Sequence, residues 1–437
     1  MREGMAKVGN GMLMYEGESP LDSEARARLK QIGHADIVVG IPSHRNGRTI
    51  GEVARAAADG IAAYLADQRV LLMNADGGSS DNTPRYISDA PVGANVEKLV
   101  TVYQGTMGKG TAIRAILEAA AQLGARACLV LEARAPGIRP EWIRALASPI
   151  LDDGYALALG CYQRSAYGAA LTDNLVYPFL RTVFGTSLRE PLAGEFCLSG
   201  ALATEYAGRD VWETDVARFG VNIWLSTQAL LEDRRICQSP LGYRGDGGGE
   251  PGMALDARFL HTMGTLFRLL STHRRLWQKE LPPRDVPYCG KPCPDRLVPC
   301  QDCVAELLDA FGDGRRQHGP QWERMFAPST LKALLGLLEQ PRETFDFAVE
   351  LWTRTVMESA VVYNRGEGDP DKVVEALLPL FYARAAAYVL RTHGLSPAAR
   401  EEVVQGVVQA FVESKPFLYE YWNGYQQWTD AVDTWPY

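Results

Sequence analysis

The stretch from Val70 to Thr83, VLLMNADGGSSDNT, constrains the fold more than any other part of the chain. Its first four residues, Val70–Met73, are apolar and typical of a short buried strand. They lead directly into a loop of small, polar and acidic turn formers. In open α/β sheets, ligands bind at the carboxyl ends of the strands, where glycines let the backbone approach closely. The stretch therefore predicts either a ligand loop, with Asp76 accepting from a base or a sugar hydroxyl, or an ordinary strand-to-helix turn.

Further strands are predicted nearby, each leading into a polar loop and then a helix. They span Ala35–Ile41, Leu99–Tyr103 and Ala127–Leu131. Strands that alternate with helices favour right-handed crossovers and a mostly parallel α/β sheet. After the second of them, Gly105–Thr111 combines glycines with Lys109 at a helix start, which suits a phosphate group. The spacing is not the Walker pattern, and the alternative is a glycine-rich helix start with a solvent-exposed lysine.

Composition excludes some classes of function. The chain has 437 residues, enough for two or three domains, and a net charge of -8 with no long basic run, which argues against nucleic acid or an anionic membrane surface as partner. No apolar run approaches the roughly 20 residues that span a bilayer. The first 20 residues contain no continuous apolar segment typical of a secretion signal. We therefore expect a cytoplasmic protein whose eight cysteines are mostly reduced.

Motifs follow one another along the first half of the chain in a recognisable order. They are Gly40–Ser43, Asn74–Ser79, Gly108–Gly110, the triplet Glu132–Arg134 ahead of Pro140–Trp142, and Pro191–Glu195. Together they resemble the GT-A glycosyltransferases, which have a Rossmann-like domain that binds nucleotide-diphospho-sugars. More narrowly, they are similar to the retaining glucosyl-3-phosphoglycerate and mannosylglycerate synthases. The resemblance implies a donor such as UDP-glucose or GDP-mannose and a small acceptor such as glycerate or 3-phosphoglycerate.

The resemblance also implies roles for single residues. Gly194 and Glu195 would lie on the acceptor side, below the sugar, and Asp76 would read the base. The implied donor-binding residues are Pro42, Ser43, Asp76, Gly108 and Lys109. From its position in a polar loop, Arg189 is either a partner for an acceptor carboxylate or phosphate, or a member of an ordinary ion pair.

The chain departs from the family pattern where the metal is bound. The family has Asp-x-Asp at the end of the fourth strand, and these carboxylates hold a divalent cation that bridges the donor phosphates. Here the triplet is Glu132-Ala133-Arg134. Asp246 replaces a metal-ligand histidine, and Asn222, which we place on the acceptor side, replaces an acid.

Three accounts of this site are open. In the first, Arg134 replaces the metal, because a guanidinium binds a diphosphate directly. In the second, Glu132 and Asp246 still hold Mg²⁺ or Mn²⁺ through hard oxygen ligands. In the third, the site is inactive, and Glu132 and Arg134 only pair with each other. The candidate catalytic residues are Glu132, Arg134 and Glu195.

The second half of the chain is predicted to be helical. Residues 1–34 form a tail and a short helix with Ser23 as a cap, 35–252 the α/β domain, and 253–437 the helical domain, entered through a connector at 282–303. Gly242–Gly252 is either a mobile flap or a linker. The connector holds four cysteines, which are a candidate zinc site or simply thiols that pack or oxidise: Cys289, Cys293, Cys300 and Cys303.

The leading hypothesis is therefore a glycosyltransferase with a nucleotide sugar and a small molecule as partners. We expect a homodimer, since the apolar helix faces suit a core or a subunit contact. The alternatives are a catalytically silent nucleotide-sugar-binding or regulatory protein, and an interaction module built on the helical half.

Overall fold

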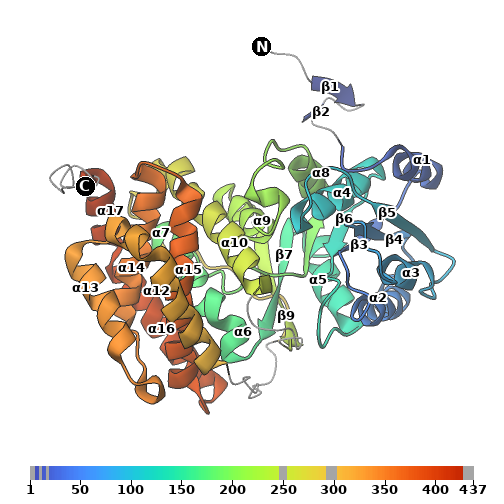
Figure 1. The fold of residues 1–437 in the computed structure, drawn as a ribbon. Coiled ribbons are helices and arrows are strands. Elements are labelled where there is room, and N and C mark those ends of the chain that lie inside the picture. The colour runs from blue at the N-terminus through green and yellow to red at the C-terminus, as the bar shows by residue number, and fades with distance from the viewer. Residues whose placement is uncertain (1–4, 9–11, 16–18, 246–252, 292–302, 427–437) are drawn as a thin grey trace. The chain divides into compact units, whose positions relative to one another are not determined.

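The computed structural model describes residues 5–8, 12–15, 19–245, 253–291 and 303–426 (Figure 1). The chain divides into two compact units, which are described separately below. The first takes the sequence ranges Met1–Gln163, Glu190–Gly248 and Val286–Cys293, and the second takes Arg164–Arg189, Gly249–Asp285 and Pro294–Tyr437. This division differs from the predicted boundary at residue 252, because Arg164–Arg189 falls within the helical unit and Val286–Cys293 within the α/β unit.

A seven-stranded sheet forms the centre of the first unit, in the order β5-β4-β3-β6-β8-β7-β9. Its strands are β3 (Ile37–Ser43), β4 (Val70–Asp76), β5 (Val96–Val102), β6 (Ala127–Val130), β7 (Leu157–Gln163), β8 (Phe196–Ser199) and β9 (Ile236–Tyr243). The neighbours β5, β4, β3 and β6 are parallel, as are β7 and β9, whereas β8 is antiparallel to both of its neighbours. The predicted fold class, a mostly parallel α/β sheet followed by a helical part, is confirmed.

Strand register places the predicted ligand loops at one edge of this sheet. Ser43 pairs with Asp76, and Asp76 pairs with Val102. Gly40 pairs with Val130, so that Glu132 follows β6 at nearly the same level. The carboxyl ends of four adjacent parallel strands therefore meet at one edge, which is where α/β sheets place their ligands.

Helices cover both faces of the sheet. They are α1 (Ser23–Ile32), α2 (Ile50–Tyr64), α3 (Thr83–Ser88), α4 (Lys109–Gln122), α5 (Glu141–Leu151), α8 (Gly200–Ala207) and α9 (Val221–Leu231), with a 3₁₀ turn at Asp215–Ala217. α4 packs closely on β3, since a Cβ at Gly40 would lie 2.3 Å from the Ile116 side chain. The predicted cap of α1 is wrong by one residue: the Asp22 carboxylate accepts from the Ala25 N–H at 2.7 Å, leaving Ser23 as the first helical residue. A separate β-hairpin pairs β1 (Met5–Val8) with β2 (Met12–Tyr15).

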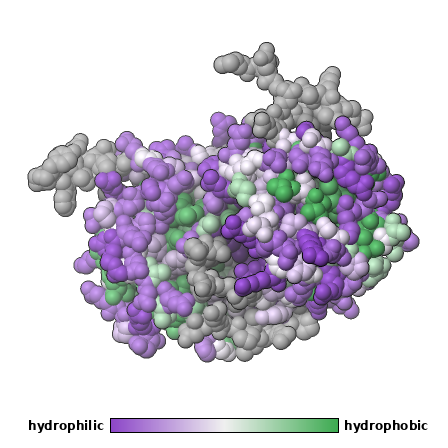
Figure 2. Space-filling model, turned by 45° about the vertical axis from the view of Figure 1, so that its right-hand side comes forward, coloured by the Kyte–Doolittle hydropathy of each residue, from purple (hydrophilic) through white to green (hydrophobic). Residues whose placement is uncertain are grey.

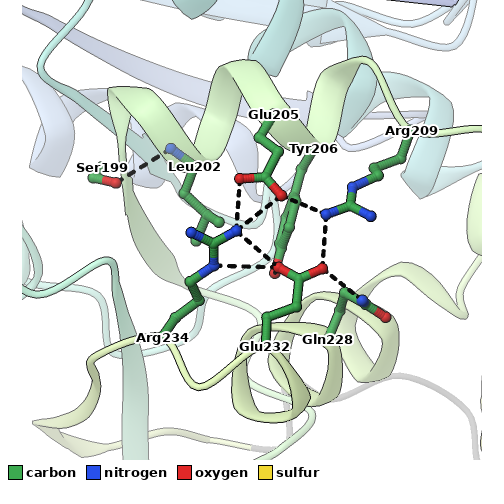
Figure 3. A network of polar contacts seen from close by, with 8 residues as sticks. All are labelled: Ser199, Leu202, Glu205, Tyr206, Arg209, Gln228, Glu232 and Arg234. Atoms are coloured by element: carbon green, nitrogen blue, oxygen red, sulfur yellow. Dashed lines mark hydrogen bonds and ion pairs between the residues drawn. The ribbon is translucent and has the colours of Figure 1, made fainter. Parts of the chain in front are cut away.

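An ion-pair network joins α8 to the turn between α9 and β9 (Figure 3). Arg209 contacts both Glu205 and Glu232, the latter at 2.7 Å. Arg234 also contacts both carboxylates, at 2.7 Å and 3.2 Å. Glu232 further accepts from Gln228 at 2.7 Å and from the Tyr206 hydroxyl at 3.3 Å. The network therefore ties two helices together before β9 enters the sheet.

The elements of the second unit, over its described residues, are helices. Its helices are α6 (Ala166–Leu171), the π-helix η1 (Thr172–Val176), α7 (Tyr177–Phe184), α10 (Met253–Thr272), α11 (Arg274–Trp277), α12 (Val304–Met325), α13 (Pro328–Gly336), α14 (Val349–Arg365), α15 (Pro370–Thr392), α16 (Pro397–Glu413) and α17 (Lys415–Gly424), with 3₁₀ turns at Leu337–Glu339 and Arg342–Thr344. The side chains of Asp369 and Ser396 cap α15 and α16 as the Asp-Pro and Ser-Pro pairs predict. Aromatic rings fill the core, for example Phe259 stacked on Phe381 at 5.0 Å.

Helix α15 is the one described helix that is long and apolar enough to cross a membrane, and 83% of its most apolar window is buried inside the protein. A core helix of a helical unit has this character. On the face drawn in Figure 2, hydrophilic side chains predominate and hydrophobic ones form small separate groups.

Candidate active site

Four charged side chains of the first unit form a continuous chain of ion pairs, which we call the charge cluster: Lys109, Glu132, Glu195 and Arg244. The Lys109 ammonium contacts Oε1 of Glu132. The Arg244 guanidinium bridges two carboxylates, with Nη2 on Oε2 of Glu132 and Nη1 on Oε2 of Glu195. Lys109 is the first residue of α4, and Glu132 follows the end of β6 by two residues. Glu195 directly precedes β8, and Arg244 directly follows β9.

Arg244 is held in place from several sides. Its backbone N–H donates to the Gln163 carbonyl at 3.0 Å, and its Nη2 donates to the Arg134 carbonyl at 3.2 Å. Its guanidinium lies 5.0 Å from the centre of the Tyr162 ring. Tyr162 sits at a register shift in β7 and donates its hydroxyl to Glu195. A guanidinium with this many partners has a fixed orientation.

The cluster is largely shielded from water. The side chains of Arg244 and Lys109 are 12% and 14% exposed, Glu195 is fully buried, and Glu132 is the most open at 29%. Burial raises the pKa of Glu195, and the negative charge of Glu132 adds to this while Arg244 opposes it. Burial alone would lower the pKa of Arg244, but Glu195 and Glu132 raise it above its usual range, so Arg244 stays charged. Glu132 is therefore the member of the cluster that is most accessible to a ligand.

The predicted base-reading residue, Asp76, is fully buried at the end of β4. Its carboxylate accepts from the Ser43 hydroxyl at 2.6 Å, and from the Ser79 N–H and hydroxyl at 2.6 Å and 2.8 Å. The structure thus brings Ser43 and Asp76 together, with Pro42 buried beside Ser43 on β3. These bonds fix the loop after β4, and contact of Asp76 with a base stays a prediction.

The glycines beside Lys109 have a packing role. A Cβ at Gly108 would lie 2.3 Å from the Ala217 carbonyl oxygen, and one at Gly110 would lie 1.8 Å from the Val216 carbonyl oxygen. The Gly110 N–H donates to the Arg218 carbonyl at 2.9 Å. These glycines therefore let the 3₁₀ turn pack closely against the start of α4. A role of Gly108 and Lys109 in donor binding stays a prediction.

Two residues predicted on the acceptor side shape the backbone next to the cluster. A Cβ at Gly194 would lie 2.4 Å from the Glu132 carboxyl carbon, so the loop lies directly against this side chain, and a larger residue there would push the carboxylate aside. Asn222 donates its side-chain amide to the Ala193 carbonyl and thereby holds the same loop. The third, Arg189, belongs to the helical unit, where it pairs with the buried Asp173 at 2.8 Å and with Glu401 at 3.2 Å. Its role toward an acceptor stays a prediction.

Other predicted ligands fall partly outside the described residues. Asp246, Cys293 and Cys300 lie there. Cys289 packs in the first unit beside Cys237. Burial raises the pKa of the Cys237 thiol, and the neighbouring Cys289 thiol raises it further. Cys303 is buried at the start of α12. Within the described ranges, no group of three His, Cys, Asp or Glu side chains is placed to hold a metal ion. The structure thus gives the proposed zinc site no support.

Two members of the site could not be found from the motifs. Arg244 lies in the glycine-rich segment that sequence reasoning interpreted as a flap or a linker, and its only signal is its place directly after the β9 sequence. Tyr162 lies near the end of β7 and belongs to none of the motifs. By contrast, Lys109, Glu132 and Glu195, which were predicted from separate motifs, meet in space.

No family model and no curated protein matches the chain. Solved structures of glucosyl-3-phosphoglycerate synthase from Mycobacterium tuberculosis do match. The complex with phosphoglyceric acid is 21% identical with a TM-score of 0.41, covering 57% of this chain and 81% of that chain. The complex with Mn²⁺, UDP and glucosyl-3-phosphoglycerate is 22% identical with the same TM-score and coverage. These proteins are of the kind that the motifs resemble, but the similarity is too low to transfer a substrate or a residue role.

A divalent cation does not fit the described part of this site. The matched synthase structures include complexes with Mn²⁺ or Mg²⁺. Here both oxygens of Glu132 already contact cationic side chains, and the bridging oxygen of Glu195 contacts Arg244. A metal ion bound through Glu132 would have to displace Lys109 or Arg244 and would then lie beside two nearly buried positive charges. A lysine or arginine side chain that loses its carboxylate partner in a nearly buried site destabilises the protein.

Proposed function

We propose that the protein is a glycosyltransferase that moves a hexose from a nucleotide-diphosphate donor to a small hydroxy acid. The observation that supports this most is the meeting of Lys109, Glu132, Glu195 and Arg244 beside the carboxyl edge of the parallel strands. A leaving diphosphate needs positive charge, and a sugar needs carboxylates that accept from its hydroxyls. The order of the motifs adds to this support.

UDP-glucose and GDP-mannose are the proposed donors, and glycerate and 3-phosphoglycerate the proposed acceptors. We propose that the anomeric configuration is retained. The acceptor hydroxyl then attacks from the side of the leaving group, and a phosphate oxygen takes its proton. In this scheme the residues of the charge cluster bind and orient the donor, and Gly194 lies on the acceptor side, below the sugar.

A transfer assay tests this proposal. The protein is incubated with each donor and each acceptor, and the products are measured by mass spectrometry together with the released nucleoside diphosphate. We expect one pair to give a glycosylated acid in an amount equal to the nucleotide released, with an unchanged anomeric configuration by NMR. Absence of product with every pair would refute transfer to these acceptors.

The second candidate is a catalytically silent nucleotide-sugar-binding protein. It is favoured by the replacement of Asp-x-Asp with Glu132-Ala133-Arg134 and by the ion pairs that already occupy Glu132. Saturable binding of a nucleotide sugar without transfer or hydrolysis would select this candidate.

A further inference from the structure

The charge cluster has a charge balance that bears on how a diphosphate would be bound. Two carboxylates, Glu132 and Glu195, are matched by two cations, Lys109 and Arg244. In a metal-dependent site, acidic residues instead leave their oxygens free for a divalent cation. Here the positive charge is already present on side chains, next to the edge of the sheet where the donor phosphates are expected.

The geometry of Arg244 suits this task. Its guanidinium presents two nitrogen atoms to two carboxylates as a fork, and it is fixed by the Arg134 carbonyl at 3.2 Å and by the Tyr162 ring at 5.0 Å. Donors that are fixed before a ligand arrives need little reorganisation when charge develops on a leaving group. Because the Arg244 side chain is only 12% exposed, water weakens its interactions little.

Lys109 and Glu132 form the more exposed end of the charge cluster, where a ligand can make contact. Lys109 stands at the first position of α4, and its ammonium rests on Glu132, the most exposed member of the cluster. An anion that approaches from this side meets both cations that Glu132 holds. Glu132 therefore occupies the place that a phosphate oxygen would take.

We propose that Lys109 and Arg244, rather than a divalent cation, neutralise the diphosphate leaving group, and that Glu132 holds both side chains ready until the donor displaces it. This inference rests on the proposed function. In the transfer, the bond between the anomeric carbon and the diphosphate oxygen breaks, and its electron pair stays on that oxygen, beside the two cations. The acceptor oxygen bonds to the anomeric carbon, and its proton passes to a phosphate oxygen.

Binding measurements with and without metal test the inference. UDP-glucose, GDP-mannose, UDP and GDP are titrated by calorimetry into the full chain, in EDTA and then in Mg²⁺ or Mn²⁺. We expect the dissociation constant of the nucleotide that binds to change by less than about threefold between these conditions. A loss of about tenfold or more in EDTA, roughly 1.4 kcal/mol, would overturn the inference and leave the proposed function standing. If no nucleotide binds in any condition, the proposed function itself fails.

Variants separate the two kinds of site further. Arg244→Lys should weaken binding about tenfold or more, because lysine keeps the charge but loses the fork of two N–H groups that grips a phosphate. Lys109→Gln should weaken binding to a similar extent, because it removes one positive charge. Glu132→Gln should strengthen binding severalfold in EDTA, since it removes the anion that competes for both cations. A metal site would respond in the opposite way, because Glu132→Gln would remove a ligand.

Controls guard against loss of folding. Arg235→Lys changes an exposed arginine that lies 4.7 Å above the Tyr155 ring, so it matches the arrangement of Arg244 on Tyr162 outside the cluster. It should bind within about twofold of the wild type. If Arg244→Lys lowers the melting temperature markedly, Lys109→Gln and Glu132→Gln decide the question, and unchanged binding in Lys109→Gln contradicts the proposal.

Discussion

The substitution Gly110→Ala tests how the start of α4 is built. An added Cβ would lie 1.8 Å from the Val216 carbonyl oxygen and 2.7 Å from the Ala217 carbonyl carbon. Both are backbone atoms, so the clash is relieved only if the 3₁₀ turn moves away and the bond from the Gly110 N–H to the Arg218 carbonyl weakens. Overpacking of this kind costs about 1–3 kcal/mol, and a backbone contact places it at the upper end.

The expected loss of about 3 kcal/mol corresponds to a fall of about 6–12 °C in the melting temperature of a unit of this size. Differential scanning calorimetry measures it. Gly406→Ala is the matched control, because Gly406 lies inside α16 and its added Cβ would meet nothing within 4 Å beyond its chain neighbours and the backbone of its own helix. That control should stabilise the protein by about 0.5–1 kcal/mol, since alanine favours helix. A Gly110→Ala protein that melts at or above the wild type would refute the close contact.

Two further predictions concern stability. Glu232→Ala should destabilise the first unit by about 1 kcal/mol in urea unfolding, because it removes the shared partner of Arg209 and Arg234, whose side chains are 40% and 37% exposed. The exposed pair Arg85–Asp89 supplies the control, and Asp89→Ala should change stability by less than about 0.5 kcal/mol; equal losses would contradict the importance of the network in Figure 3. Burial lowers the pKa of His273 below its usual value of 6.5, so the unfolded chain takes up a proton first as the pH falls, and stability should be lost from about pH 6.5 downward. His273→Leu should reduce this slope by at most about 1.4 kcal/mol per pH unit, and an unchanged slope would show that other groups cause the acid sensitivity.

Strong local patterns made much of the first unit predictable. The apolar run Val70–Met73 and its turn-rich loop correspond to β4 and its ligand-type end, and the alternation of strands and helices gave the parallel neighbours β5, β4, β3 and β6. Lys109, Glu132 and Glu195 were singled out from different motifs, and the fold brings them together. The order of the motifs was therefore enough to predict three of the four residues of the charge cluster.

What the sequence hid depends on tertiary context. β9 contains Pro240 and Gly242, which disfavour a strand, but it lies at the edge of the sheet, where proline is tolerated. If β9 is not predicted, Arg244 is not recognised as the residue that follows a strand, and its glycine-rich surroundings indicate a linker. The close contacts of Gly108 and Gly110 with a turn more than 100 residues later likewise have no local signal.

A crystal structure of the protein with a bound nucleotide sugar is the most direct test of the central claim. We expect the diphosphate oxygens within hydrogen-bond distance of the Lys109 ammonium and the Arg244 guanidinium, with Glu132 released from at least one of them. A nucleotide sugar bound away from these side chains, or one that leaves both ion pairs of Glu132 intact, would contradict the account.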